Sequence, residues 1–285
     1  MQFGMPTLIE NRTLEQNVKL CESLGLNFIE LNMNFPECGL VQLEQTDYLM
    51  RLAEEAGIYY TVHLDENLNI ADFNELVKDA YLETVRRSIA AARRLLPLRD
   101  RFGDPSQPLI LNMHMNHGIH ITLPDRKVQM YKRDFDIYMR AFASFRDKCE
   151  AWTGGRDVKI AVENTDGFRD YEKKAIDLLL ESPVFGLTWD IGHSKATHEK
   201  DVPFIIKRSE RLCHFHIHDG TEMPPRNHLA LSDGEIDLIE RLRLAEKLNA
   251  RCVLETKTVE ALKRSAMWLS EKGLAAPVQV KTKTF

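Results

Sequence analysis

Short apolar runs alternate with longer amphipathic segments along almost the whole chain. The apolar runs are interpreted as strands and cover residues 2–8, 27–31, 58–62, 108–113, 158–162, 185–189, 211–217 and 251–254. The segments between them have helical periodicity and are predicted as helices over residues 13–24, 41–56, 74–95, 130–152, 170–181, 199–210, 235–247 and 258–272. These eight strand–helix repeats predict an α/β fold, a single (β/α)8 TIM barrel. A doubly wound open sheet is the alternative, because one sequence does not reveal strand order.

Local signals agree with one continuous domain. Thr13, three residues before Gln16, predicts a capping box at the start of the first helix. No shift in composition and no Gly/Ser-rich linker divides the chain. We therefore predict a barrel domain over residues 1–273 and a C-terminal extension over residues 274–285.

Composition narrows the classes of function. Of the 285 residues, 44% are hydrophobic, and the formal net charge is −5, which argues against a protein that binds nucleic acid through an overall positive charge. The five Cys form no CxxC pair, so neither a disulfide framework nor a thiolate zinc site is expected. The N-terminus lacks the pattern of a signal peptide, and no run approaches 18 apolar residues. We expect a cytoplasmic protein that does not bind a membrane.

Side chains that can bind metals stand at the ends of the predicted strands. They are Glu30, His63, His114, Glu163, Asp190, His193, His216 and Glu255, with His228 in the loop after the seventh strand. In a parallel barrel all these strand ends meet at one mouth, where active sites form. Carboxylates and imidazoles gathered there predict a divalent metal site. We expect Zn²⁺ or Mn²⁺, with Mg²⁺ or Fe²⁺ as alternatives.

Several of these side chains have alternative interpretations. Glu30 is either a substrate contact or a structural carboxylate. His214 and His218 flank His216 with the same two-residue spacing and are interpreted as structural or supporting groups. Three further histidines, His117, His120 and His198, are expected to be solvated surface residues. Three aromatic residues either cover the substrate or belong to the core: Phe35, Phe168 and Trp189.

The motifs around these residues resemble those of the xylose isomerase-like TIM-barrel superfamily over roughly residues 1–270. The matching segments are AVENT with Glu163, WDIGHS with Asp190 and His193, HFHIHD with His216, and VLETK with Glu255. This superfamily contains sugar and sugar-phosphate isomerases and epimerases as well as AP endonucleases of the endonuclease IV type. Resemblance to the epimerase branch implies that Glu163, Asp190, His216 and Glu255 hold one divalent metal. It also implies that Glu163 and Glu255 are the catalytic proton-transfer groups and that His193 binds substrate.

The endonuclease IV branch adds further metal ligands. By resemblance, these correspond to His63 and His114 after the third and fourth strands, and to His228 after the seventh. That branch has an Asp where this chain has Arg226, and a guanidinium cannot ligate a cation, so the third metal position is disrupted. Arg226 is interpreted either as a contact for an anionic substrate group or as a surface salt-bridge residue.

The combined interpretation is a metal-dependent isomerase or epimerase of a small sugar, sugar phosphate or related polyol. Glu-mediated proton transfer would pass through a metal-stabilised enediolate. The alternative is a metal-dependent hydrolase, an endonuclease IV-like phosphodiesterase. A barrel that binds a metabolite without turnover is disfavoured, because each of the four core ligands is present. We expect a small-molecule substrate and no nucleic-acid partner, and the sequence leaves a homo-oligomer open.

Overall fold

The computed structural model describes residues 1–275 and shows a closed barrel of eight parallel strands. Around the barrel the strands follow the order β1-β12-β9-β8-β7-β4-β3-β2. Their bounds are β1 (Phe3–Pro6), β2 (Phe28–Asn32), β3 (Tyr59–His63), β4 (Leu109–His114), β7 (Val158–Glu163), β8 (Phe185–Asp190), β9 (Leu212–Ile217) and β12 (Arg251–Leu254). The TIM-barrel prediction is confirmed, and closure through the β1-β12 pair excludes the open sheet.

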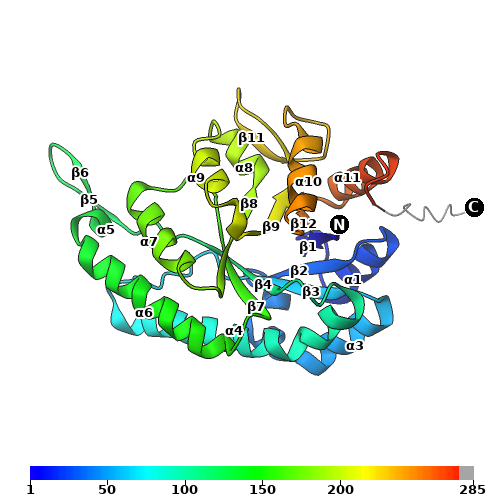
Figure 1. The fold of residues 1–285 in the computed structure, drawn as a ribbon, viewed down its shortest axis with the longest axis horizontal. Coiled ribbons are helices and arrows are strands. Elements are labelled where there is room, and N and C mark those ends of the chain that lie inside the picture. The colour runs from blue at the N-terminus through cyan, green and yellow to red at the C-terminus, as the bar shows by residue number, and fades with distance from the viewer. Residues whose placement is uncertain (276–285) are drawn as a thin grey trace, which may run out of the picture.

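Helices surround this barrel (Figure 1). They are α1 (Leu14–Ser23), η1 (Pro36–Cys38), α2 (Leu40–Leu43), α3 (Thr46–Ala56), α4 (Glu75–Phe102), α5 (Met130–Arg133), α6 (Phe135–Thr153), α7 (Asp170–Leu180), α8 (Ile191–Ala196), α9 (Val202–Ile206), η2 (Ser209–Arg211), α10 (Leu238–Lys247) and α11 (Val259–Glu271). The predicted capping box is present at the start of α1. None of the helices within residues 1–275 is both long enough and apolar enough to cross a membrane.

Some predicted elements differ from the observed ones. The expected helix over 199–210 is reduced to α9 and η2, because helix α8 begins directly after β8 and uses part of the connection. Two antiparallel hairpins were not predicted: β5 (His120–Thr122) with β6 (Lys127–Gln129), and β10 (Asp219–Thr221) with β11 (Arg226–Leu229). The hairpin β5–β6 projects from the barrel (Figure 1), and each of its largely exposed strands has only 3 residues, too few for an alternating pattern to be recognised in the sequence.

The predicted C-terminal extension, 274–285, lies largely outside the described residues. The domain boundary therefore stays a prediction.

Side chains fill the barrel interior in layers that follow the two-residue period of the strands. At the amino-terminal end the rings of Phe28 and Tyr59 stack with their centroids 5.1 Å apart, and the Arg251 guanidinium lies 5.3 Å from the Tyr59 centroid. Two residues further along the same strands, the layer becomes polar, and the Thr61 hydroxyl donates to Glu30 Oε2 at 3.0 Å. The following layer of side chains lies at the mouth of the barrel, at the carboxyl ends of the strands.

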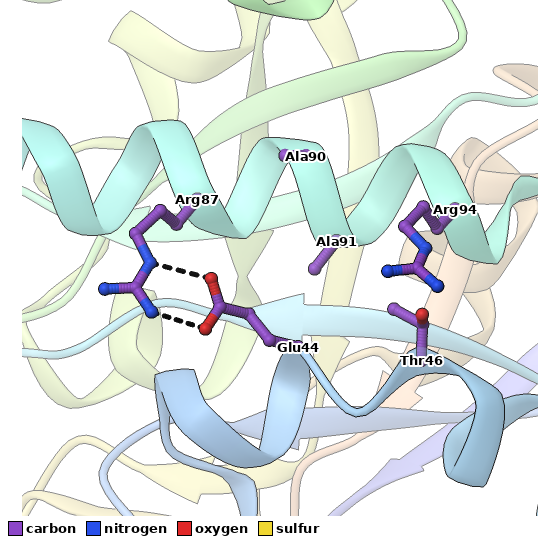
Figure 2. A pocket seen from close by; sticks show the side chains of 6 residues that line it. All are labelled: Glu44, Thr46, Arg87, Ala90, Ala91 and Arg94. Carbon is purple, nitrogen blue, oxygen red and sulfur yellow. Dashed lines mark hydrogen bonds and ion pairs between the residues drawn. The ribbon is translucent and has the colours of Figure 1, made fainter.

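A separate hollow of about 250 Å³ lies outside the barrel, between α4 and the segment α2–α3 (Figure 2). Arg87 of α4 forms two hydrogen bonds to the Glu44 carboxylate beside this hollow. Arg94 lies further along the same helix, beside Thr46, and its guanidinium is 3.3 Å from Asp47 Oδ1. Both arginines are paired with nearby carboxylates. This hollow lies between the outer helices and is separate from the mouth of the barrel.

Candidate metal centre

Strand register brings the acidic and imidazole side chains to one level at the mouth. His114 of β4 is paired with Glu163 of β7, and Asp190 of β8 is paired with His216 of β9. Glu255 follows the last residue of β12, which pairs with β9 on the side opposite β8. The four residues implied as core ligands therefore come from four adjacent strands and meet inside the barrel.

His216 Nδ1 lies between the carboxylates. It is 3.3 Å from Glu163 Oε1, 3.2 Å from Glu255 Oε2 and 4.0 Å from Asp190 Oδ2. All four side chains are buried, yet His216 Nδ1 and Glu255 Oε2 make no hydrogen bond within residues 1–275. Buried carboxylates are costly unless a positive charge compensates them. These donor atoms and their unmet bonding capacity fit a divalent cation.

The protonation of His216 depends on the same carboxylates. Burial on its own would lower the pKa of His216, but Glu163 and Glu255 outweigh it and raise the pKa well above its ordinary value. The centre thus attracts a positive charge, either a proton on the ring or a metal ion. Because a ligating imidazole must be neutral, metal binding would displace that proton.

Glu30 lies one layer below and orients His216. Its Oε1 is 2.8 Å from His216 Nε2, and its Oε2 is 2.9 Å from His214 Nε2. Burial alone would raise the pKa of Glu30, but the two imidazoles outweigh it and hold the pKa well below its usual value. The Glu30 carboxylate thus faces the Nε2 side of the ring as a charge partner, and Nδ1 is the nitrogen turned toward the centre. This placement favours the structural role over the substrate contact.

Asp190 is held by the helix that it begins. It is the N-cap of α8, and its Oδ1 accepts the backbone N–H of His193 at 2.6 Å. Its Oδ2 lies 2.9 Å from Nε2 of buried His218. A Cβ at Gly192 would stand 1.9 Å from the His218 ring, so only glycine lets the helix pack there. The WDIGHS motif therefore positions the Asp190 carboxylate rigidly.

A second group of donors lies beside the first. His63 Nε2 is 3.1 Å from His114 Nε2, which is 3.2 Å from Glu163 Oε2. His63 Nδ1 lies 2.8 Å from the backbone carbonyl of Leu64, so Nδ1 donates there and Nε2 keeps its lone pair for the group. As the sequence suggested, these three side chains could hold another cation next to the first.

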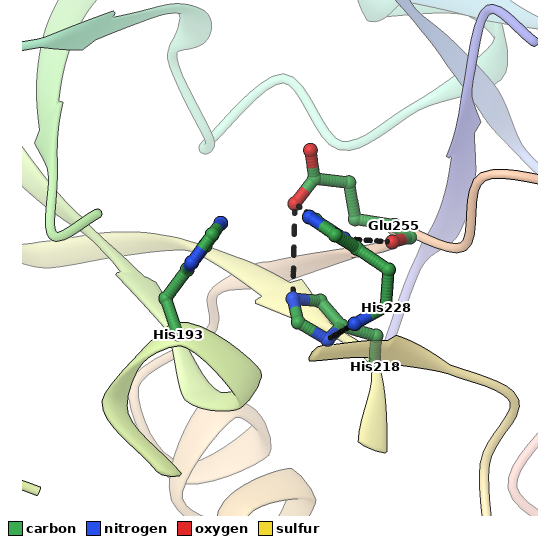
Figure 3. Close-up of side chains that lie close together, drawn as sticks. All are labelled: His193, His218, His228 and Glu255. Carbon is green, nitrogen blue, oxygen red and sulfur yellow. Dashed lines mark hydrogen bonds and ion pairs between the residues drawn. The ribbon is translucent and has the colours of Figure 1, made fainter. Parts of the chain in front are cut away.

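A third group contains His193, His218, His228 and Glu255, with one donor atom from each within 4.8 Å of the others (Figure 3). His228 Nδ1 lies 2.9 Å from the backbone carbonyl of Glu255. Burial lowers the pKa of His228 to about 4, so its imidazole is neutral near pH 7. The structure thus brings His228 to the mouth and places His193 where a ligand in the mouth would meet it.

Arg226 does not take part in this group. It is exposed on β11, and its Nε lies 3.4 Å from the Thr221 hydroxyl within the same hairpin. Its neighbour Asn227 reaches the mouth instead, with Nδ2 3.1 Å from His193 Nδ1. The geometry does not support the interpretation of Arg226 as a contact for an anionic group.

The mouth itself is a cleft of about 510 Å³ above the donor groups. Its lining includes His114, His193 and Asn227, together with Asp166 and Glu66. Within the described part of the chain, the cleft lining contains no Lys or Arg. The cleft is therefore suited to an uncharged polar ligand more than to an anion.

Two neighbours of Glu163 and Glu255 were not among the residues singled out from the sequence. The Asn112 amide donates to Glu163 Oε2, and the Lys257 ammonium lies 2.8 Å from Glu255 Oε1. Burial opposes ionisation of Glu255, but His216 and Lys257 outweigh it and keep its pKa low. Asn112 stands two residues before His114 on β4, so strand periodicity was a signal for it, whereas Lys257 lies in the connection after β12 and had no such signal.

His117 is not the solvated residue expected from the sequence. Its Nδ1 lies 2.5 Å from the fully buried Glu172, and its Nε2 lies 2.6 Å from Asp166. Of the other histidines, His120 is exposed, and His198 pairs with the partly exposed Glu222. Of the three aromatic residues with two interpretations, Trp189 and Phe168 are buried in the core, which is the second of those interpretations.

Replacing Glu30 with glutamine is expected to weaken metal binding by about 10- to 100-fold, because an amide does not hold the His216 ring as a carboxylate does. Competition against a chelator would measure the affinity, and circular dichroism would confirm the fold. Glu37→Gln, in the loop after the same strand, is the matched control. Equal affinities for the Glu30 variant and wild type would contradict the orienting role.

His117→Gln is expected to destabilise the fold more in acid than in base. The hydrogen bond to Glu172 raises the pKa of His117, so the extra stability is complete below its ordinary pKa of 6.5 and is lost as the pH rises through the raised value. Burial opposes ionisation of Asp166, but Arg169 and His117 lower its pKa to about 2, so it stays charged throughout.

Thermal unfolding at about pH 5.5 and about pH 9 would check this prediction. We expect a loss in Tm that is larger by roughly 2–4 °C at the lower pH, corresponding to an ion pair of about 1 kcal/mol. The same loss at both pH values would show that His117 contributes only neutral hydrogen bonds.

Comparisons with known proteins identify the family of the chain. Residues 18–272 match the model of the xylose isomerase-like TIM barrel family. The uncharacterized protein MJ1614 of Methanocaldococcus jannaschii is 22% identical over 268 residues, 90% of this chain and 92% of that protein. A D-tagatose 3-epimerase-like protein has a similar structure, with a TM-score of 0.72 and 20% identity, over 96% of this chain and 98% of that one. The 3-keto-D-glucoside 4-epimerase YcjR from E. coli gives a TM-score of 0.68 at 14% identity, over 95% and 99% of the two chains. Because the family model spans most of its length, this chain belongs to the xylose isomerase-like TIM barrel family.

Proposed function

We propose that the protein is a divalent-metal-dependent isomerase or epimerase that acts on an uncharged small sugar. One observation carries the proposal: two buried glutamates, Glu163 and Glu255, face each other across His216 Nδ1 at the floor of a polar cleft. The solved structures with a similar fold include proteins named as sugar epimerases, which supports the same class of reaction here.

The metal would be held by Glu163, Asp190, His216 and Glu255. A divalent cation at this position supplies Lewis-acid polarisation of neighbouring sugar oxygens. Oxygen-rich donor sets with an imidazole suit Mn²⁺, Zn²⁺, Mg²⁺ and Fe²⁺. His63 and His114 would extend the donor set toward a second cation, which shares Glu163, and His228 lies on the opposite side beside Glu255.

The two glutamates divide the proton transfer between them. One carboxylate removes a proton from the carbon next to the sugar carbonyl, and the other returns a proton to the opposite face. Glu255 Oε2 makes no hydrogen bond within residues 1–275, whereas Glu163 Oε2 accepts from Asn112. Glu255 Oε2 is therefore free to accept a proton in the resting site, while Glu255 Oε1 is held by Lys257. His193, at the edge of the cleft, would bind a substrate hydroxyl.

The cleft favours an uncharged sugar over a sugar phosphate or a phosphodiester. Phosphate groups are typically bound by Lys, Arg or helix N-termini. Among the described residues the cleft lining carries Asp166 and Glu66 but no cationic side chain other than histidine. Arg226 takes the sequence position of the Asp that the endonuclease IV branch uses for its third metal; it contacts Thr221 within its own hairpin and is not part of the cleft lining. The endonuclease IV-like alternative is therefore not favoured.

Hydrogen exchange with solvent tests the proposal directly. We expect metal-loaded protein in D2O to place one deuteron on the carbon next to the carbonyl of D-fructose, D-tagatose or D-psicose, with formation of an epimer or isomer, measured by NMR. Chelation should abolish the exchange, and Mn²⁺ or Zn²⁺ should restore it. Absence of exchange with every ketohexose, together with cleavage of bis-p-nitrophenyl phosphate, would favour the hydrolase instead.

A further inference from the structure

A second cleft, of about 330 Å³, adjoins the mouth. Asn67 and Asn116 line both clefts, so the two clefts adjoin at these residues. The outer cleft is built from the segment that joins β3 to α4, from the segment after β4, and from Tyr81 of α4 and Tyr131 of α5. The mouth is lined by His114 and His193, whereas none of the candidate metal donors lines the outer cleft within the described residues.

Hydrogen bonds and ring contacts hold the outer cleft in shape. The Tyr131 hydroxyl donates to Asn69 Oδ1 at 2.7 Å, and the Asn69 amide donates to Asp72 Oδ2 at 3.0 Å. The Phe73 ring meets Tyr131 edge-on, with centroids 5.5 Å apart. Gly118, at a φ of 66°, passes so close to the Tyr131 ring that a Cβ would clash at 2.4 Å. These contacts place polar and aromatic groups around one hollow.

The lining of the outer cleft has the chemistry that binds a sugar ring. Phe73 is 40% exposed and, with Tyr81, offers aromatic surface to the apolar C–H side of a pyranose. The Asp72 carboxylate can accept hydroxyl protons, and Asn116, whose Oδ1 is used by the Gly118 N–H, can donate from Nδ2. Within the described residues no Lys or Arg lines this cleft, which disfavours an anionic group here too.

We infer that the substrate is an uncharged glycoside, with its reacting sugar in the mouth and a second sugar unit in the outer cleft. The inference rests on the proposed function for the reacting sugar and extends it to the size of the substrate. Phe73 lines the outer cleft and not the mouth, so a monosaccharide bound in the mouth alone would leave its aromatic surface in water. Each cleft has the volume of a small-molecule site, and the shared asparagines lie where the two units would join.

The test compares D-fructose with two disaccharides that carry it as the reducing unit, lactulose and isomaltulose. For metal-loaded wild type we expect kcat/KM for deuterium exchange to be at least about tenfold higher with one disaccharide than with D-fructose, equivalent to about 1.4 kcal/mol. Phe73→Ala should lower this ratio by about 5- to 10-fold, and Phe73→Tyr should restore it. Leu76→Ala, an exposed apolar residue of the adjoining helix that lies outside the cleft lining, is the matched control.

Saturation-transfer NMR on the outer sugar of each disaccharide gives an independent measure of binding. Equal turnover of D-fructose and both disaccharides, unaffected by Phe73→Ala, would overturn the second subsite and leave the proposed function in place. Disaccharide binding that Phe73→Ala weakens, without exchange of any sugar, would support the subsite and overturn the proposed reaction. Neither binding nor exchange would overturn both.

Discussion

Asp190→Ala is expected to reduce the bound metal from about one equivalent to less than roughly 0.1, and to reduce the exchange rate by roughly 10³-fold. The substitution removes a ligand and also frees His218, whose Nε2 lies 2.9 Å from the lost carboxylate. Elemental mass spectrometry on protein purified without chelator would measure the metal. Unchanged metal content in the folded variant would place the metal elsewhere.

Asp190 also caps helix α8, so the experiment needs variants that separate the loss of the cap from the loss of a metal ligand. Asp237→Ala removes the N-cap aspartate of α10, which accepts the Glu240 N–H at 3.0 Å, and serves as the matched control. It should cost about 1 kcal/mol of stability and leave the metal bound. Asp190→Asn keeps a capping side chain but weakens ligation, so it should retain the fold and still lose most of the metal.

Glu255→Gln is expected to lower kcat by about 10³-fold with a smaller change in KM, because an amide cannot accept the proton that the carboxylate removes. Rates must be divided by the metal bound in the same sample, since Glu255 is also a proposed ligand. Steady-state deuterium exchange would measure kcat, with Glu246→Gln on the exposed side of α10 as the control. A kcat per bound metal within tenfold of wild type would exclude Glu255 as the base.

The barrel and the core donors were predictable from sequence for a physical reason. Parallel strands read as short apolar runs, and their carboxyl ends must meet at one mouth, so strand-end residues such as Glu163 and Asp190 were found without knowledge of strand order. The height of a side chain inside the barrel was not predictable, because it depends on the stagger of the closed sheet. Glu30 therefore looked like a mouth residue, although it lies one layer below and faces His216.

Residues in the connections were harder to place. The sequence left Arg226 open between a contact for an anionic group and a surface residue; in the structure Arg226 is exposed on β11, and its neighbour Asn227 contacts His193. His117 looked solvated because its partners, Asp166 and Glu172, follow about fifty residues later in another connection. Such pairings depend on the tertiary arrangement of loops, which hydrophobic periodicity does not encode.

The proposed metal ligands come from one half of the chain, so the site depends on how the two halves assemble. Glu163, Asp190, His216 and Glu255 all stand on strands of the C-terminal half of the barrel, from β7 to β12. The carboxylate that faces His216 Nε2, Glu30, comes from β2 in the other half. A fragment that begins near residue 150 would carry all four proposed ligands without this partner of the histidine. If the proposed site is correct, high-affinity metal binding would report that the two halves of the chain have joined.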